Sequence, residues 1–188
     1  NGFGILIDPW LDKKLNPESS VLLQRERREN SSLSQEELDK VEVVIITAPF
    51  IDHLHMPSIK KLNNKVKIIT TEKVKKILIK NRINNPIACI NHHVIDVGPF
   101  KMSTFPAGFP YSWSAFCFFL ENSEGKTIFH EGHKANFNTL KKLKKKCDVV
   151  LITLDSVKFL GIITLSMSSK DGFRTASLLD SKRIMATG

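Results

Sequence analysis

The chain has 188 residues, of which 41% are hydrophobic and 25% are charged. This composition excludes disordered and fibrous proteins and is typical of one globular domain, which we expect to span residues 1–188. The formal net charge of +9 favours anionic partners, nucleic acid among them, although a general abundance of lysine accounts for part of the excess.

The sequence indicates neither a disulfide-held protein nor a membrane protein. Its three cysteines, Cys89, Cys117 and Cys147, form no CxxC or CxxH pair. No apolar run reaches the roughly 18 residues that a membrane-spanning helix needs, and no signal-peptide pattern is present. We therefore expect an intracellular protein, cytoplasmic or organellar, without a membrane partner. The chain lacks an initial Met and has a strand pattern at each end, which is typical of a domain truncated at both ends.

Strand and helix patterns alternate in the first half of the chain. Residues 3–8 predict a short strand closed by a turn, and residues 11–32 predict a polar surface excursion. Ser34 and Glu37 have the spacing of a capping box at the start of a helix. The apolar residues 41–48 predict a strand buried on both faces. A helix over 57–62, a strand over 66–70 and a helix over 72–82 follow.

The second half begins with strands and then alternates in the same way. Short strands over 86–105 are broken by Gly98 and Pro99, and segments 114–120 and 126–130 predict a hairpin. Residues 138–146 predict a helix rich in lysine, a composition typical of a solvated helix face. A buried strand over 148–154, a helix over 171–179 and a strand over 183–186 complete the chain, which predicts α/β layering.

Potential metal ligands follow the buried strand over 41–48. Asp52 and His53 lie in the loop directly after this strand, and His55 offers a second imidazole. Sites in α/β proteins form outside the carboxyl ends of strands, and carboxylates and imidazoles bind zinc or iron. Alone, the pattern fits a surface histidine pair beside a capping aspartate equally well.

A second cluster follows the strand over 126–130. His130, Glu131 and His133 supply two imidazoles and a carboxylate, and Gly132 permits a tight turn between them. Two such clusters after two separate strands are what a layered α/β fold uses to assemble a metal centre.

In its ordered motifs the chain resembles the metallo-β-lactamase superfamily. The residues that carry the resemblance are 5–10 (ILIDPW), 45–53 (IITAPFIDH), 125–133 (GKTIFHEGH), 148–153 (DVVLIT) and 176–187 (ASLLDSKRIMAT). Nearly the whole chain is covered in the right order, most closely by a degenerate branch of cyanobacterial and plant members. The resemblance implies an αββα sandwich of metallo-β-lactamase type.

The resemblance also implies which metal ligands remain. Asp52 and His53 match second-site ligands, and His133 stands where the superfamily has a bridging aspartate. Ala48 and Phe50 replace the two leading histidines. No histidine lies near 107–110, and Thr187 stands where the closing histidine is expected. One site around Asp52, His53 and His133 is therefore implied, with His55, His130 or Glu131 as additional ligands.

Three interpretations of function follow. The missing ligands favour a protein that keeps the fold of metal-dependent hydrolases with a degenerate metal site and has lost the chemistry. The first alternative is a hydrolase of a small, anionic ester, lactone or phosphodiester that uses one Zn or Fe ion, with Asp52 and Glu131 as catalytic residues and Glu131 as general base. The second alternative is a basic nucleic-acid-binding protein.

Overall fold

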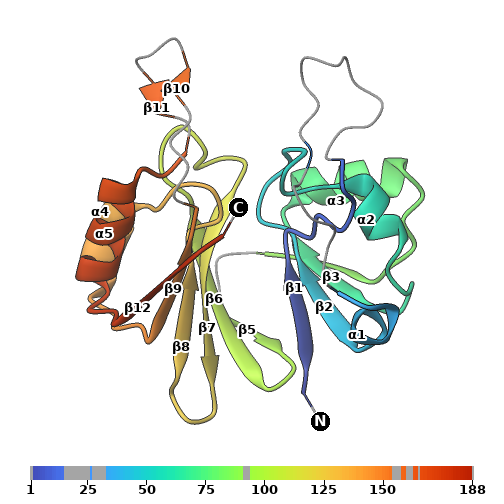
Figure 1. Ribbon diagram of the computed structural model, residues 1–188, viewed down its shortest axis with the longest axis horizontal. Coiled ribbons are helices and arrows are strands. Elements are labelled where there is room, and N and C mark those ends of the chain that lie inside the picture. The colour runs from blue at the N-terminus through green and yellow to red at the C-terminus, as the bar shows by residue number, and fades with distance from the viewer. Residues whose placement is uncertain are drawn as a thin grey trace. The chain divides into compact units, whose positions relative to one another are not determined.

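The computed structural model describes residues 2–14, 26, 33–90, 94–153, 158–159, 163–164 and 166–187 (Figure 1). The chain divides into two compact units, Asn1–Ile90 and Asn91–Gly188. Each unit is built on its own β-sheet, so the two are described in turn.

The first unit contains a four-stranded parallel sheet in the order β1-β2-β3-β4. One face is covered by two helices: Ile59 of α2 and Leu78 of α3 join the buried cluster that includes Val44 and Ile68 of the sheet. The continuous apolar run around Val44 therefore forms a central strand, as its pattern predicts. The bounds are β1 (Gly4–Ile7), α1 (Gln35–Asp39), β2 (Val41–Ile45), α2 (Met56–Lys60), β3 (Lys67–Thr70), α3 (Glu72–Lys80) and β4 (Ile87–Cys89).

The second unit contains a six-stranded sheet in the order β12-β9-β8-β7-β6-β5. Strands β5 to β8 are antiparallel neighbours, whereas β9 pairs in parallel with β8 and β12. Helices α4 and α5 lie side by side next to this sheet (Figure 1). The bounds are β5 (Val94–Val97), β6 (Phe100–Pro106), β7 (Phe116–Asn122), β8 (Thr127–His130), α4 (Phe137–Leu143), β9 (Val149–Ile152), β10 (Lys158–Phe159), β11 (Ile163–Thr164), α5 (Ser169–Leu178) and β12 (Arg183–Ala186).

The sequence predictions locate these elements well and their ends less well. The capping box of Ser34 and Glu37 is confirmed, with Glu37 N–H donating to Ser34 Oγ at 3.3 Å. The lysine-rich helix was predicted to reach residue 146 but ends at Leu143, because Lys144 adopts a left-handed conformation with φ of 47°. Most of the predicted surface excursion, residues 15–25 and 27–32, lies outside the described residues.

Within the part of the chain that the structure describes, none of the helices has the length and apolar character needed to cross a lipid bilayer.

Helix α3 offers a matched test of the first unit's core. Leu78 is fully buried, whereas the neighbouring Ile79 is 58% exposed. We expect Leu78→Ala to lower the free energy of unfolding by about 2–5 kcal/mol through lost burial and a residual cavity. Ile79→Ala, which removes a similar side chain from the surface, is expected to change it by less than about 1 kcal/mol. Urea titration measures both, and equal losses would contradict the burial pattern.

Candidate metal centre

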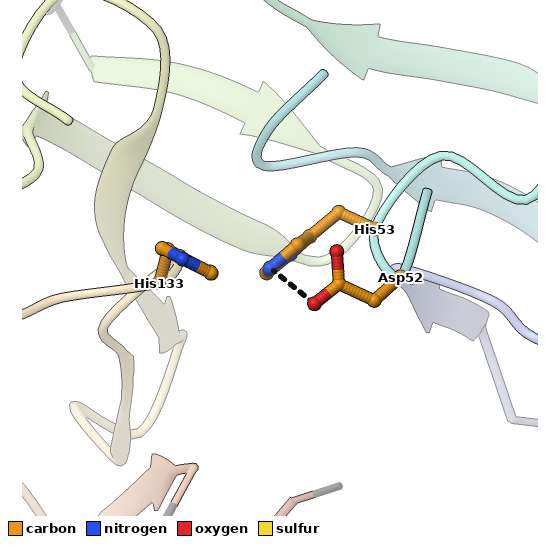
Figure 2. A group of neighbouring side chains, drawn as sticks. All are labelled: Asp52, His53 and His133. Atoms are coloured by element: carbon orange, nitrogen blue, oxygen red, sulfur yellow. Dashed lines mark ion pairs between the residues drawn. The ribbon is translucent and has the colours of Figure 1, made fainter. Parts of the chain in front are cut away.

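His53 is fixed by a carboxylate that reaches it from another strand. Its Nδ1 lies 2.7 Å from Oδ2 of Asp8, which directly follows β1. An aspartate carboxylate only accepts hydrogen bonds, so Nδ1 carries the proton and the lone pair of the neutral ring is on Nε2. That Nε2 faces Oδ2 of Asp52 at 3.9 Å (Figure 2). A histidine oriented by a carboxylate in this way is typical of metal ligands.

Asp8 is itself held by the strand next to its own. Its backbone N–H donates to the Ile45 carbonyl at 2.9 Å, and its Oδ1 accepts from Thr47 N–H at 2.7 Å. The Thr47 hydroxyl donates to Oδ2 at 2.5 Å. Asp8 has a φ of 45°, which aspartate tolerates better than most residues. From the sequence, Asp8 is predicted only to lie in a turn, although its place directly after a strand was a signal for a site residue.

His55, two residues beyond His53, is engaged within the first unit. The side chain is buried, and Nδ1 lies 2.7 Å from Oγ of Ser58 in α2. Its ring also lies beside Trp10, with centroids 6.5 Å apart. Through these contacts, His55 attaches α2 to the segment after β1. They give no support to its role as an additional ligand, which stays a prediction.

Apolar side chains occupy the positions where the superfamily resemblance expects the two leading histidines. Ala48 is fully buried. The Phe50 ring meets the His53 ring nearly edge-on, with centroids 6.3 Å apart and planes 69° apart. Neither side chain has an atom that binds a metal, and the Phe50 ring restricts the space on its side of His53.

The turn that presents His133 depends on a glycine in the second unit. Gly132 has a φ of 70°, and a Cβ atom built there would lie 1.8 Å from the Phe116 carbonyl oxygen. Only glycine fits so close to β7, and the chain then turns to place the His133 ring nearly perpendicular to the Tyr111 ring, with centroids 4.2 Å apart.

His130, the second imidazole of this cluster, serves the turn. Its Nδ1 accepts a hydrogen bond from Gly132 N–H at 3.0 Å, so the proton of the neutral ring is on Nε2. The ring stacks on Phe118 with centroids 5.2 Å apart. The lone pair on Nδ1 of His130 is thus used within its own turn, and its role as an additional ligand stays a prediction.

Glu131 lies inside the second unit at 1% exposure. Its Oε1 accepts from Thr153 N–H at 2.8 Å and so links the end of β8 to the end of β9. Burial raises the pKa of the Glu131 carboxyl, and the hydrogen bond from Thr153 N–H only partly opposes this. A carboxyl group without access to solvent is better suited to holding the ends of β8 and β9 together than to activating a water molecule.

Comparison with known proteins identifies the family. The model of the beta-lactamase superfamily domain matches residues 4–187, and the chain therefore belongs to this family. No curated protein sequence matches the chain.

Solved structures with low sequence identity share the fold. A possible metal-dependent hydrolase from Veillonella parvula has a TM-score of 0.79 and 18% identity, over 97% of this chain and 77% of that chain. An isothiocyanate hydrolase from Delia radicum gut bacteria has a TM-score of 0.75 and 18% identity, over the same shares of the two chains. A metallo-beta-lactamase fold protein from Bacillus subtilis has a TM-score of 0.63 and 12% identity, over 80% of this chain and 66% of that chain. The prediction of an α/β fold of metallo-β-lactamase type, and the family resemblance behind it, are confirmed.

Two glycines with the same backbone conformation test the turn before His133. Gly125 has a φ of 76° with nothing within 4 Å of a built Cβ, whereas the Cβ of Gly132 would collide with the Phe116 carbonyl. We expect Gly125→Ala to cost about 1–2 kcal/mol of unfolding free energy, from left-handed strain alone. Gly132→Ala adds the collision and is expected to cost about 3 kcal/mol or more. Chemical denaturation measures the difference, and equal costs would show that the close approach to β7 is unimportant.

Proposed function

We propose that this protein is a metal-dependent hydrolase that has kept one metal ion of the superfamily centre, Zn or Fe, with Asp52, His53 and His133 as the ligands. The observation that carries the proposal is the short contact between His53 Nδ1 and Asp8 Oδ2 at 2.7 Å. A surface histidine with no ligand role has no need of a buried carboxylate that fixes its tautomer with the lone pair on Nε2.

The chemistry of these three side chains suits one divalent ion. Two imidazoles and one carboxylate form a sufficient set for catalytic zinc and also match the facial set that binds Fe(II). A metal ion there would lower the pKa of water toward about 7 and polarise a substrate carbonyl or phosphoryl oxygen. Asp8 keeps the proton on His53 Nδ1, and Asp52 adds a negative charge beside Nε2.

The proposed reaction is hydrolysis of an ester, lactone or phosphodiester. The water oxygen forms a bond to the acyl carbon or phosphorus, the bond to the leaving oxygen breaks, and the proton that the water releases goes to that leaving oxygen. The hydrolases among the structural neighbours support a small substrate. The match of one family domain to residues 4–187 supports the single domain expected over residues 1–188.

Nucleic-acid binding gains less support. Two lysines of the basic run are already paired, Lys145 with Glu121 at 2.8 Å and Lys146 with Asp180 at 2.7 Å. Each pair reduces the positive charge available to a phosphate backbone.

Metal content tests the ligand set without any substrate. Purified wild-type protein, measured by elemental analysis after dialysis, is expected to hold about one zinc or iron ion per chain, because three ligands suffice. We expect His53→Ala and His133→Ala to lose it, and Asp8→Asn to bind it about 10- to 100-fold more weakly.

The control for metal content is Asp39→Asn, which neutralises an exposed aspartate of the same unit outside the proposed site. It should retain the wild-type content, whereas Asp52→Asn should not. Wild-type protein that holds no more metal than His53→Ala would refute the proposed centre.

Hydrolysis is a separate question from binding. With 4-nitrophenyl acetate and bis(4-nitrophenyl) phosphate as substrates, we expect release of 4-nitrophenol that a chelator abolishes and added zinc or iron restores. Asp52→Asn should lower kcat/KM by about 100-fold or more, since it removes an anionic ligand. Bound metal without turnover above that of Asp52→Asn would instead indicate a fold retained without its chemistry.

A further inference from the structure

Two large aromatic side chains project from residues 107–115, the loop between β6 and β7, which we call the aromatic loop. Trp113 is 95% exposed and Phe109 is 80% exposed. Exposed aromatic side chains that gather on one short segment are a feature of interaction sites, since each leaves a large apolar surface in water.

The aromatic loop is closed by its own hydrogen bonds. Ala107 N–H donates to the Ala115 carbonyl at 3.1 Å, and Ala115 N–H donates to the Tyr111 carbonyl at 2.9 Å. Tyr111 N–H in turn donates to the Gly108 carbonyl at 2.9 Å. The two alanines at its ends are buried. Phe109 and Trp113 are therefore presented by an ordered loop and have little backbone entropy to lose when they bind a ligand.

The same loop is attached to the turn that carries His133. Gly108 N–H donates to the Lys134 carbonyl at 2.8 Å, and the Asn136 amide donates to the Pro106 carbonyl at 3.1 Å. A Cβ atom at Gly108 would lie 2.6 Å from the Ala135 carbonyl oxygen, so the two segments lie as close as glycine allows. Tyr111 completes the link through its ring contact with His133.

We infer that the aromatic loop is the substrate-recognition element of the site at His133, and that Trp113 and Phe109 stack on a planar, uncharged group of the substrate. The inference rests on the proposed function, because it takes the bond to be hydrolysed to lie near His133. It adds the substrate class: a small ester or lactone that carries an aromatic or flat apolar group.

The absence of charged side chains in the loop favours a neutral, planar group over nucleic acid or an anionic lipid. Residues 107–115 include no charged side chain, in a chain with 28 lysines and arginines. A surface that bound nucleic acid or an anionic lipid would place lysine or arginine among its aromatics to meet the phosphates. A neutral, planar group needs only the apolar faces.

Tryptophan fluorescence tests the inference without turnover. The chain has two tryptophans, so Trp10→Phe leaves Trp113 as the single reporter. With 4-nitrobenzyl alcohol, a neutral nitroaromatic quencher, we expect saturable quenching of Trp113. Phe109→Ala in this background should weaken binding of the alcohol about 2- to 10-fold, as the loss of one aromatic contact does. Phe173→Ala, which removes an aromatic side chain from α5 that is 69% exposed, should leave it unchanged.

Two outcomes would overturn the inference. Quenching that rises linearly with the alcohol concentration and is unchanged by Phe109→Ala would be collisional, and would show that the alcohol does not bind at the loop. A blue shift of Trp113 on phosphatidylglycerol vesicles, without saturable quenching by the alcohol, would assign the loop to a lipid surface.

The substrate inference and the proposed function can fail independently. If quenching is saturable but the protein has no hydrolytic activity, the binding role of the aromatic loop is supported and only the proposed reaction is refuted. Conversely, if 4-nitrophenyl acetate is hydrolysed but Trp113→Ala leaves its KM unchanged, the reaction stands and the recognition role is lost. Trp113 is almost fully exposed, so its replacement is not expected to affect folding.

Discussion

The carboxylate of Asp8 connects fold and chemistry in the first unit. It receives hydrogen bonds from the Thr47 backbone, the Thr47 hydroxyl and His53 Nδ1, and its side chain is only 11% exposed. A charge with so little contact with water needs these donors, and each donor in turn is fixed by the charge. The same residue thus ties the end of β1 to the end of β2 and decides which nitrogen of His53 has the lone pair.

In the second unit, the turn before His133 is fixed mainly by close packing and not by a buried charge. Gly132 lies against the Phe116 carbonyl, and its N–H donates to Nδ1 of His130. The His130 ring in turn stacks on Phe118. Glu131 bonds to the backbone of Thr153 from inside the unit. Three residues that look like potential ligands or catalysts in the sequence therefore have different contacts: His130 bonds within the turn, Glu131 links the ends of β8 and β9, and His133 lies against Tyr111.

Much of the fold could be predicted from the sequence, and less of the site. Apolar runs and turn residues located the central strands and the hairpin, because burial and turn geometry depend on local pattern. The end of α4 at Leu143 was missed, since Lys144 gives no sign of a left-handed conformation. The partner of His53 was missed for another reason: Asp8 is 45 residues away in the chain, and only the pairing of β1 with β2 brings it close. Likewise, the sequence could not show which nitrogen of His130 is already used.

The superfamily resemblance places His133 where a bridging aspartate is expected, and Ala48 and Phe50 where the two leading histidines are expected. Two divalent ions about 4 Å apart repel strongly, and a shared carboxylate offsets that repulsion by offering an anionic oxygen to each ion. A neutral imidazole offers one lone pair at a time and no charge, so it cannot take over the bridge. In the proposed centre, Phe50 lies against His53 where the superfamily resemblance expects a histidine, so a second ion would lack both its bridge and that ligand. The charge of Asp52 and the two imidazoles would suit one ion, which is why we propose a mononuclear centre.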